Sequence, residues 1–554
     1  MFQECFVDVT VALTIRTATP LMQREALIGP ARATVFIRCG RVRRPPPQCV
    51  ILLERSSTLT MRTFLIKDSN YKWWAFSALA LGVFTSVADA GSVVVALPTI
   101  ADHFGTDLPT SQWVVTAYAL TISAFLLPMG RLSDMIGRKK VYILGQLLFV
   151  GGAFWATAST NFLLLVVPRV LMGIGAAMTQ GTSMAMLVSA FSADERGKAL
   201  GLQMGVVGAG GVGGPMLGGF IVGALGWRGV FLVIGALAAV ATIAAQLIIR
   251  RQRSERSSHS SFDWLGAALS AGFLSLFLLA MSNGPKSGWS SPLVLTAMVG
   301  VAPLILAFVL WELRIKMPMF DLRFFRRRLF SLGVQASFLS FIGMSSVRFL
   351  MPFYLQSVLG YSSSQTGLLI VPAALTTVVV GPLGGRLSDR YGWRVFNVAG
   401  LMVSASGLFI LSTVTRNTPL ALVIGAMVIQ SLGMGTFNAP NNSSILSTVR
   451  RESYGVVAAF LNVVRNSGNV TSIAVVTAVV TAAMVASGYP PTLAAVSSNG
   501  SEGILDAFTQ GLRFAYMVTA TFVSIAAVLS LVKGERKRQR DEEETGPAEM
   551  GTSV

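Results

Sequence analysis

Long apolar runs alternate with short polar segments along most of this chain. From Trp73 onward, runs of about 18 to 25 mostly apolar residues are separated by brief polar breaks, and a helix of about 20 such residues crosses the hydrocarbon core of a bilayer. The pattern therefore predicts fourteen membrane spans. Their approximate limits are 73–97, 112–130, 141–158, 163–186, 198–222, 229–249, 264–281, 293–312, 331–355, 366–384, 395–414, 418–437, 455–485 and 510–532.

The length of these runs also decides which secondary structure crosses the membrane. A spanning β-strand needs only about 10 residues of alternating hydrophobicity, whereas longer runs satisfy their backbone hydrogen bonds internally as helices. We therefore predict an all-α polytopic membrane protein. The composition agrees, because 53% of the 554 residues are hydrophobic and 12% are charged, against about 25% charged residues in soluble domains. This composition argues against a soluble enzyme.

The basic residues indicate how the protein is oriented. The formal net charge of +19 would suggest a nucleic-acid partner if the protein were soluble. After residue 60, however, 29 Lys and Arg fall in loops on one side of the membrane, 4 on the other and 3 within spans. Cytoplasmic loops carry the excess of basic residues. We therefore predict a multi-pass protein of the plasma (inner) membrane with both termini cytoplasmic and no nucleic-acid partner.

The two ends of the chain differ from the apolar middle. All three cysteines and eight arginines, but no lysine, fall within the first 60 residues. We expect residues 1–60 to be an upstream region translated before a true start at Met61; the alternative is an Arg-rich transit peptide. No disulfide framework is implied in either case. The charged segment 534–554 has nothing to bury, and we expect a disordered cytoplasmic tail.

One five-residue sequence occurs twice. Gly-Arg-Leu-Ser-Asp at 130–134 recurs at 385–389, an offset of 255 residues, and each copy is followed by a glycine and a basic residue. Both copies are expected in cytoplasmic loops between the second and third helices of a six-helix unit. The repeat predicts an N-terminal six-helix bundle (61–250), two inserted helices (251–329) and a C-terminal six-helix bundle (330–533). Duplicated halves around a midplane site are typical of secondary transporters.

These repeated loops are candidates for a gate on the cytoplasmic side. An acid near helix N-termini, together with bases and glycines, can hold adjacent helix ends together, and breaking such contacts would let the halves rock. The alternative is that the residues follow the charge bias of cytoplasmic loops. The predicted gate residues are Gly130, Arg131, Asp134, Gly137, Arg138, Gly385, Arg386, Asp389 and Arg394.

Four motifs in order make the chain resemble the 14-helix drug/proton antiporter family of the major facilitator superfamily. The segment 130–140 (GRLSDMIGRKK) is similar to the signature between helices two and three, with Met135 where a base is usual. In the first span, 89–98 (DAGSVVVALP) resembles D-x-T-x-V-N-x-A-L-P, with Gly91 and Val94 in place of Thr and Asn. In the fourth span, 169–177 (RVLMGIGAA) resembles R-x-x-Q-G-x-G-A-A, with Met172 for Gln. The resemblance covers residues 72–533 and implies the major-facilitator fold.

The fifth span carries the fourth of these motifs. Glycines at every fourth position, 210, 214 and 218, would let a neighbouring helix approach closely, and a proline after the second glycine would bend the helix. The alternative is generic packing by small residues. The residues that match the family's antiporter motif are Gly201, Gly210, Gly214, Pro215, Gly218 and Gly219, and the resemblance implies proton-driven export.

Asp89 is the one carboxylate placed well inside a predicted span, where a charge costs about 2.5–3.5 kcal/mol on insertion scales. Arg169 is its natural partner, because the two lie about 14 and 12 Å below the same outer surface at 1.5 Å per residue. A cation favours the ionised carboxyl group and desolvation the protonated one, so a carboxyl group that alternates between these surroundings can carry a proton. We predict proton coupling by this pair; the alternative is a structural ion pair.

Two further arginines fall within spans without an obvious acid, Arg348 and Arg465, and leave the interior with a net charge of +2. If they line a cavity, amphipathic neutral, zwitterionic or anionic compounds suit it better than small hydrophilic cations. Alternatively, Arg348 reaches towards headgroups, or either arginine binds backbone carbonyls. The residues expected to line a substrate cavity are Trp113, Tyr118, Gln203, Arg348, Phe353, Asn438, Asn441 and Arg465.

These features predict a secondary active transporter that exports small amphipathic or lipophilic compounds, such as drugs, antibiotics or toxic metabolites, in exchange for protons. The alternative is a facilitator or proton symporter that imports a small metabolite. A membrane-embedded enzyme is disfavoured, since the two histidines, His103 and His259, lie in loops and no metal-ligand cluster or catalytic dyad is present. We expect no cofactor and no metal. The partners are substrate, protons and lipid, with a monomer or an accessory protein left open.

Overall fold

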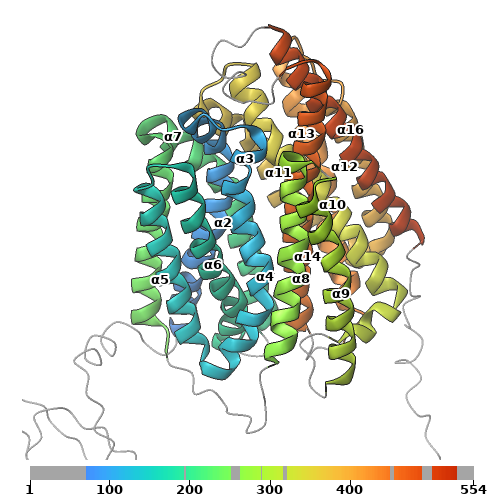
Figure 1. The fold of residues 1–554 in the computed structure, drawn as a ribbon. Coiled ribbons are helices and arrows are strands. Elements are labelled where there is room, and N and C mark those ends of the chain that lie inside the picture. Colours follow the sequence, from blue (N-terminus) through green and yellow to red (C-terminus); the bar gives the residue numbers. More distant parts are fainter. Residues whose placement is uncertain are drawn as a thin grey trace, which may run out of the picture. The chain divides into compact units, whose positions relative to one another are not determined.

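The computed structural model describes residues 70–191, 195–250, 263–288, 290–315, 321–449, 454–489 and 502–532. Within these ranges the regular elements are helices (Figure 1). Their bounds are α2 (Tyr71–Phe104), α3 (Leu108–Ser111), α4 (Trp113–Ile136), α5 (Arg138–Thr157), α6 (Phe162–Ala190), α7 (Arg196–Ile248), α8 (Trp264–Ser287), α9 (Pro292–Arg314), η3 (Leu322–Arg326), α10 (Arg328–Phe353), η4 (Tyr354–Val358), α11 (Ser363–Tyr391), α12 (Trp393–Leu411), α13 (Leu420–Leu446), α14 (Tyr454–Ala486) and α16 (Glu502–Val532). The predicted extension 1–60, with its three cysteines, and the tail 534–554 lie outside the described residues.

The helices account for every predicted span. In the described part, 12 helices are long and apolar enough to cross a membrane. One of them, α7, has 53 residues and would extend about 80 Å, far more than the roughly 30 Å hydrocarbon core. It breaks at Gly226, whose φ of 70° is left-handed, and so contains the fifth and sixth spans. Helix α4 supplies the second span. The prediction of an all-α polytopic fold is confirmed.

Polar residues between the spans cap the N-terminus of the next helix. Asn161 accepts a hydrogen bond from the backbone N–H of Leu164 at the start of α6, and Ser362 forms a capping box with Gln365 at the start of α11. Such caps satisfy backbone donors that the helix itself leaves free. The chain therefore turns back at each break, and successive helices alternate in direction. We call the end of the helices that contains Gly137 the Gly137 end, and the opposite end the Gly105 end.

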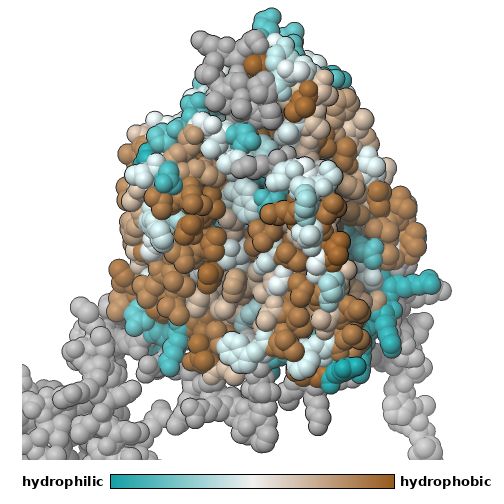
Figure 2. All heavy atoms as spheres, viewed as in Figure 1, coloured by the Kyte–Doolittle hydropathy of each residue, from teal (hydrophilic) through white to brown (hydrophobic). Residues whose placement is uncertain are grey.

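Two six-helix bundles and an inserted pair make up the described part. We call α2–α7 the N half and α10–α16 the C half. Helix α8 packs against α4 of the N half and α14 of the C half, and α9 packs on α8. Trp311 of α9 donates a hydrogen bond to Asp263, which caps α8. In the view of Figure 2, hydrophobic residues cover the sides of the helices and hydrophilic residues gather towards their ends, as expected of a lipid-facing surface.

The internal repeat is visible in the packing as well as in the sequence. A Cβ atom added to Gly145 of α5 would lie 2.8 Å from the carbonyl oxygen of Gly175 in α6. In the C half, a Cβ on Gly400 of α12 would lie 2.8 Å from the carbonyl oxygen of Gly433 in α13. Gly145 and Gly400 have the same 255-residue offset as the repeated pentapeptide. The two halves therefore use glycines at equivalent positions to bring equivalent helices together.

The repeated pentapeptides do not lie in loops, which corrects the sequence-based expectation. Both copies form the last turns of a helix, α4 in the N half and α11 in the C half. The connection to the next helix is a single glycine, Gly137 (φ 105°) or Gly392 (φ 90°). One residue suffices because a glycine adopts the positive φ that reverses the chain. In both copies the serine hydroxyl donates to the carbonyl oxygen of the first glycine, at 2.6 and 2.7 Å.

Candidate functional site: a buried ion pair and the helices that hold it

Asp89 of α2 and Arg169 of α6 form an ion pair inside the N half. The Nη1 of Arg169 lies 2.6 Å from Oδ2 of Asp89, and both side chains are 0% exposed. Charge-assisted hydrogen bonds of this length are among the stronger ones in proteins. The sequence placed both residues at similar depth, and the structure brings them into contact.

The rest of the arginine is held by the N half alone. Its Nε donates to the carbonyl oxygen of Val114 at 2.8 Å, and its guanidinium lies 4.3 Å from the ring centre of Tyr118. The Tyr118 hydroxyl donates to the carbonyl oxygen of Ser86 in α2. Tyr118, predicted to line a substrate cavity, is thus part of the ion-pair cluster. Oδ1 of Asp89 and Nη2 of Arg169 have no hydrogen-bond partner among the described residues.

The glycines of the fifth-span motif hold the helix that carries Asp89. A Cβ on Gly214 would lie 2.6 Å from the carbonyl oxygen of Ala88, and one on Gly218 would lie 2.5 Å from Cα of Ser92. Ser92 also donates to the carbonyl oxygen of Gly214 at 2.6 Å. Ala88 immediately precedes Asp89, so the contact with α7 fixes the backbone on which the carboxylate stands. Of the remaining motif residues, Gly210 lies beside Val87, Pro215 beside Gly91, and Gly201 in the first turns of α7.

A second face of the same motif contacts the C half. A Cβ on Gly219 would lie 2.5 Å from the carbonyl oxygen of Ser363 in α11, and Ser364 donates to the carbonyl oxygen of Gly219. Gln356 of η4 donates to the carbonyl oxygen of Val95 in α2 at 3.0 Å. These contacts lie at the Gly105 end. The helix that supports Asp89 therefore also closes that end against the C half.

The predicted gate residues lie at the Gly137 end, divided between the two halves. Arg138 donates to the carbonyl oxygen of Ala185 in the N half, and Arg394 donates to that of Leu531 in the C half. These two bonds stay within one half each. Gly130 and Gly385 lie in the helix ends, Arg131 is half-buried and Arg386 exposed. The side chains of Asp134 and Asp389 lie outside the described part.

The predicted cavity residues differ in accessibility. Phe353 is buried beside Phe349, and Asn441 is buried and donates to the carbonyl oxygen of Gly333. Gln203 is buried in α7. These three side chains, like that of Tyr118, are covered by their neighbours in this structure. The other four candidates keep accessible surface: Arg348 is exposed, and Trp113, Asn438 and Arg465 are half-buried.

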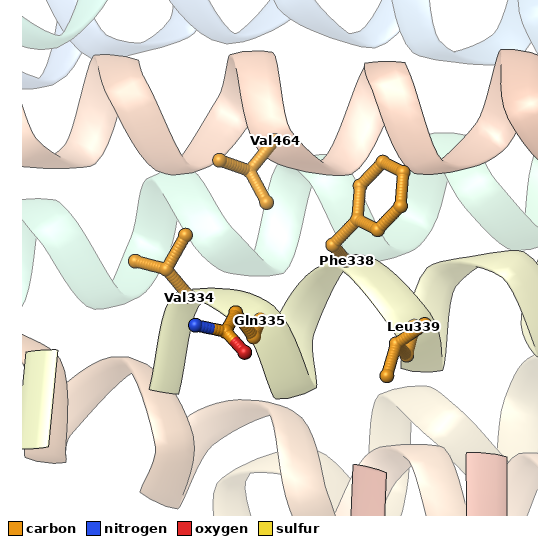
Figure 3. A pocket seen from close by; sticks show the side chains of 5 residues that line it. All are labelled: Val334, Gln335, Phe338, Leu339 and Val464. Carbon is orange, nitrogen blue, oxygen red and sulfur yellow. The ribbon is translucent and has the colours of Figure 1, made fainter. Parts of the chain in front are cut away.

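A small hollow of about 330 Å³ lies between α10 and α14. Figure 3 shows Val334 and Phe338 of α10 pointing towards Val464 of α14 across it, while Gln335 and Leu339 point away from α14. Apart from Gln335 the lining is apolar. These residues do not stand out in the sequence, because valine, leucine and phenylalanine occur at many positions of every span.

A set of polar contacts within the C half was not predicted from the sequence. Ser345 of α10 donates to the side chain of Asn469 in α14, and Ser472 of α14 donates to the carbonyl oxygen of Ile342 at 2.6 Å. The signal in the sequence was an unusual density of asparagines in an apolar run, 462, 466 and 469. Within the described ranges, no cluster of three or more His, Cys, Asp or Glu could hold a metal ion.

Comparison with known proteins agrees with this architecture. The sequence profile of the Major Facilitator Superfamily matches residues 79–473. The riboflavin transporter RibZ of Clostridioides difficile is 32% identical over 71% of this chain and 85% of its own length. The multidrug resistance protein Stp of Mycobacterium tuberculosis is 31% identical over 73% of this chain and 75% of its own. A solved bacterial homologue of the human lysosomal transporter Spinster, in an inward-facing conformation, shares the fold with a TM-score of 0.62 at 18% identity, over 84% of this chain and 97% of that one.

Proposed function

The chain belongs to the Major Facilitator Superfamily, a family of transporters rather than enzymes, and we propose that it exports small amphipathic or lipophilic compounds in exchange for protons. The observation that carries this proposal is the fully buried Asp89–Arg169 pair. A buried carboxylate beside a single cation can exist ionised with its partner or protonated without it. Alternation between these two forms as the helices move would carry one proton per cycle.

The link between the ion pair and the movement of the halves runs through α7. Gly214 and Gly218 contact α2 on either side of Asp89, and Gly219 contacts α11 of the C half. Separation of α7 from α11 would therefore shift the backbone that carries Asp89. Protonation of Asp89 would in turn weaken its attraction to Arg169 and free α2 to move. One proton moving inward across 100 mV is worth about 2.3 kcal/mol, which is sufficient to drive substrate outward against a gradient.

We further propose that the Gly137 end is cytoplasmic, that the protein resides in the plasma membrane, and that this structure is the inward-facing state. The excess of basic residues in the loops at the Gly137 end supports the orientation. The contacts of Gln356 and Ser364 with the N half support closure of the opposite, Gly105 end. Arg138 and Arg394 would contribute to the cytoplasmic gate when that end closes.

A second candidate function is import of a small metabolite, by facilitation or proton symport. The observation in its favour is the similarity to a protein named as a riboflavin transporter, at 32% identity. The resistance proteins among the relatives, such as Stp at 31% identity, favour export. Both functions use the same alternation of access, and they differ in the direction of net substrate movement under a proton gradient.

The test is transport in inverted membrane vesicles containing the full chain, with and without an imposed pH gradient. A panel would include neutral, anionic and cationic lipophilic dyes, antibiotics and riboflavin. Proton-driven export predicts that acidification of the vesicle lumen increases dye accumulation and that dye addition releases lumenal protons. Asp89→Asn should abolish both effects while the protein remains folded. Accumulation that persists at full rate without a gradient, or in Asp89→Asn, would contradict proton coupling.

A further inference from the structure

One face of α14 carries four polar side chains within a membrane-spanning helix. Asn462, Arg465, Asn466 and Asn469 follow the spacing i, i+3, i+4, i+7, which places them along a single face of a helix. All four are half-buried. In a membrane-spanning segment, amides and a charge that keep accessible surface are expected to face a water-filled cavity rather than lipid.

The same face changes character along the helix. Ile473, Val476 and Val480 continue it towards the Gly105 end at helical spacing, and these three side chains are almost fully buried, with at most 4% exposed. They belong to the apolar core that also contains residues of α2, α4 and α10. The face is therefore sealed and apolar near the Gly105 end but polar and accessible nearer the Gly137 end. This is the arrangement of a wall that lines a cavity open at the Gly137 end.

The contacts of Arg465 orient its charge along this wall. It donates to the side chain of Asn462, one turn earlier on the same helix, and its guanidinium lies 5.9 Å from the ring centre of Phe341 in α10. Asn469 accepts a hydrogen bond from Ser345 of α10. Arg348 is one turn beyond Ser345 and is exposed. The wall thus continues from α14 onto α10.

No acid balances these two arginines in the described part. The ion pairs among the described residues involve other arginines and lysines, and Asp89 is already neutralised by Arg169. The accessible wall therefore carries a net positive charge next to amide donors. Val464, which precedes Arg465 on α14, is one of the residues that line the apolar hollow of Figure 3. Cation, amides and an apolar surface together match a ligand with an anionic head and a hydrophobic body.

We propose that this face of α14, together with Arg348, binds an amphipathic organic anion, with Arg465 contacting its carboxylate and Asn466 donating a hydrogen bond beside it. The inference rests on the proposed function, because it names the substrate class that the exporter would carry. Arginine suits this role since its planar donors match the geometry of a carboxylate. A cation of similar size and hydrophobicity would be repelled from the same wall.

The test is binding of two dyes of one scaffold to the purified full chain. Fluorescein carries a free carboxylate and is anionic at neutral pH, whereas rhodamine 123 is the methyl ester of a related xanthene and is cationic. Fluorescence anisotropy should give a Kd for fluorescein about tenfold lower than for rhodamine 123. Arg465→Gln should raise the Kd for fluorescein about tenfold or more, since it removes a charge-assisted hydrogen bond to the carboxylate, and leave the Kd for rhodamine 123 unchanged or lower.

Matched variants separate the ligand contact from a loss of folding. Arg465→Lys keeps the charge and should restore part of the fluorescein affinity, whereas Asn466→Asp adds a negative charge without changing size and should weaken fluorescein binding and strengthen rhodamine 123 binding. Arg513→Gln removes an exposed arginine of α16, whose Nε donates to the Ser412 carbonyl oxygen, and should leave both Kd values unchanged. Size-exclusion profiles and melting temperatures check the fold of each variant.

Two outcomes would overturn the anion site: tighter binding of rhodamine 123 than of fluorescein by the wild-type chain, or an equal effect of Arg465→Gln on both dyes. The result is independent of proton coupling. If fluorescein binding depends on Arg465 but a pH gradient drives no transport in vesicles, the anion site stands and the proposed exchange with protons fails. If the gradient drives transport of cations in preference to anions, only the anion site fails.

Discussion

The N half and the C half share a fold but treat their buried charges in opposite ways. Contacts between α7 and α2 recur between α14 and α10: a Cβ on Gly214 would lie 3.1 Å from Cα of Gly91, and one on Gly468 would lie 3.1 Å from Cβ of Phe341. These contacts make Gly91 of α2 equivalent to Phe341 of α10, so Asp89, two residues before Gly91, corresponds to Leu339, two residues before Phe341. In the same way, the contacts of Gly145 with Gly175 and of Gly400 with Gly433 make Gly175 of α6 equivalent to Gly433 of α13. Arg169 lies six residues before Gly175, and its counterpart six residues before Gly433 is the buried Met427. The C half thus has two apolar residues where the N half has an ion pair.

On α7 and its counterpart α14, the polar and charged residues lie instead in the C half. Arg465, Asn466 and Asn469 on α14 correspond to Gly211, Val212 and Pro215 on α7. The C half therefore places amides and an accessible cation where the N half has glycine, valine and proline. The difference favours a division of labour in which the N half carries the proton and the C half holds the substrate. The two bundles therefore share helix contacts but differ in charge and polarity at equivalent positions.

Removal of Arg169 should have the largest effect. Arg169→Met places in the N half the residue that the C half has at position 427, but leaves Asp89 buried without its cation. Loss of one partner of a buried pair costs about 3–5 kcal/mol, so the melting temperature in detergent should fall strongly and proton-driven transport should stop. The double variant Asp89→Leu/Arg169→Met, which copies Leu339 and Met427, should recover stability but not transport.

Met427→Leu is the matched control in the C half. A volume-conserving apolar swap usually costs less than about 1.5 kcal/mol, so stability and transport should both stay near wild type. The division of labour would be wrong if the double variant still transported substrate in exchange for protons, since the coupling group would then lie elsewhere.

Valine at Gly214 and at Gly468 should lower stability to a similar extent, but only the first should affect proton coupling. Valine at either position meets backbone, the carbonyl oxygen of Ala88 at 2.6 Å or that of Phe338 at 2.9 Å from the new Cβ. Overpacking of this kind costs about 1–3 kcal/mol, and we expect a loss of about 3 kcal/mol in both halves. Gly214→Val should also reduce the number of protons released per substrate, because the displaced backbone carries Asp89.

Gly205→Val is the control for a glycine-to-valine change in α7 without a close contact, since no atom lies within 4 Å of the added Cβ at Gly205. Unchanged proton release with Gly214→Val at normal expression would remove the coupling role of the fifth-span motif, and leave it as helix packing.

The sequence predicted the spans, the repeat and the ion pair because each leaves a signal along the chain. Hydrophobic runs have the length of a bilayer, and an isolated charge such as Asp89 stands out within one. The helical end of α4 was missed, because polar residues such as Arg131 and Ser133 look like a loop when read alone. In the structure Ser133 donates to the Gly130 carbonyl oxygen within the helix.

The accessibility of the predicted cavity residues does not follow from the sequence, for a different reason. Tyr118, Phe353 and Asn441 have the residue types of a binding site, but burial by neighbours on other helices decides whether a side chain is accessible. Sequence does not give the rotation of one helix against another. On α14 the spacing of Asn462, Arg465 and Asn469 was a signal of a common face that was not used, and the structure shows that this face keeps accessible surface.

Equivalent glycines of the two halves should respond equally where they serve packing alone. Gly145→Ala and Gly400→Ala each place a Cβ 2.8 Å from a carbonyl oxygen of the neighbouring helix, and we expect each to cost about 2 kcal/mol by overpacking. Thermal unfolding of the two variants in detergent, side by side, measures this. Gly151→Ala and Gly425→Ala are the controls, because nothing lies within 4 Å of either added Cβ.

A clear inequality between Gly145→Ala and Gly400→Ala would mean that the halves differ in rigidity as well as in charge. If instead the two control variants lose as much stability as the test variants, helix packing at Gly145 and Gly400 is not the cause of the loss.

The smallest effect is expected at the glycine turns that follow the repeated pentapeptides. Gly137 and Gly392 have φ values of 105° and 90°, which a residue with a side chain adopts only with strain, while nothing lies within 4 Å of a Cβ added at Gly137. Alanine at either turn should therefore cost about 1 kcal/mol through the backbone alone. Gly130→Ala, a helical position whose added Cβ would meet only the Gly181 carbonyl oxygen at 3.6 Å, should cost less.

These turn variants also test whether the gate residues of both halves are needed to close the Gly137 end. Both turns lie at the Gly137 end and are one residue long, so strain in either changes the angle between the two helices it joins. If closure of that end needs both halves, Gly137→Ala and Gly392→Ala should slow substrate exchange by similar factors in the vesicle assay, despite the unequal charges of their bundles. A large effect from Gly137→Ala and none from Gly392→Ala would place the gate in the N half, next to the ion pair, and leave the second pentapeptide as a relic of the duplication.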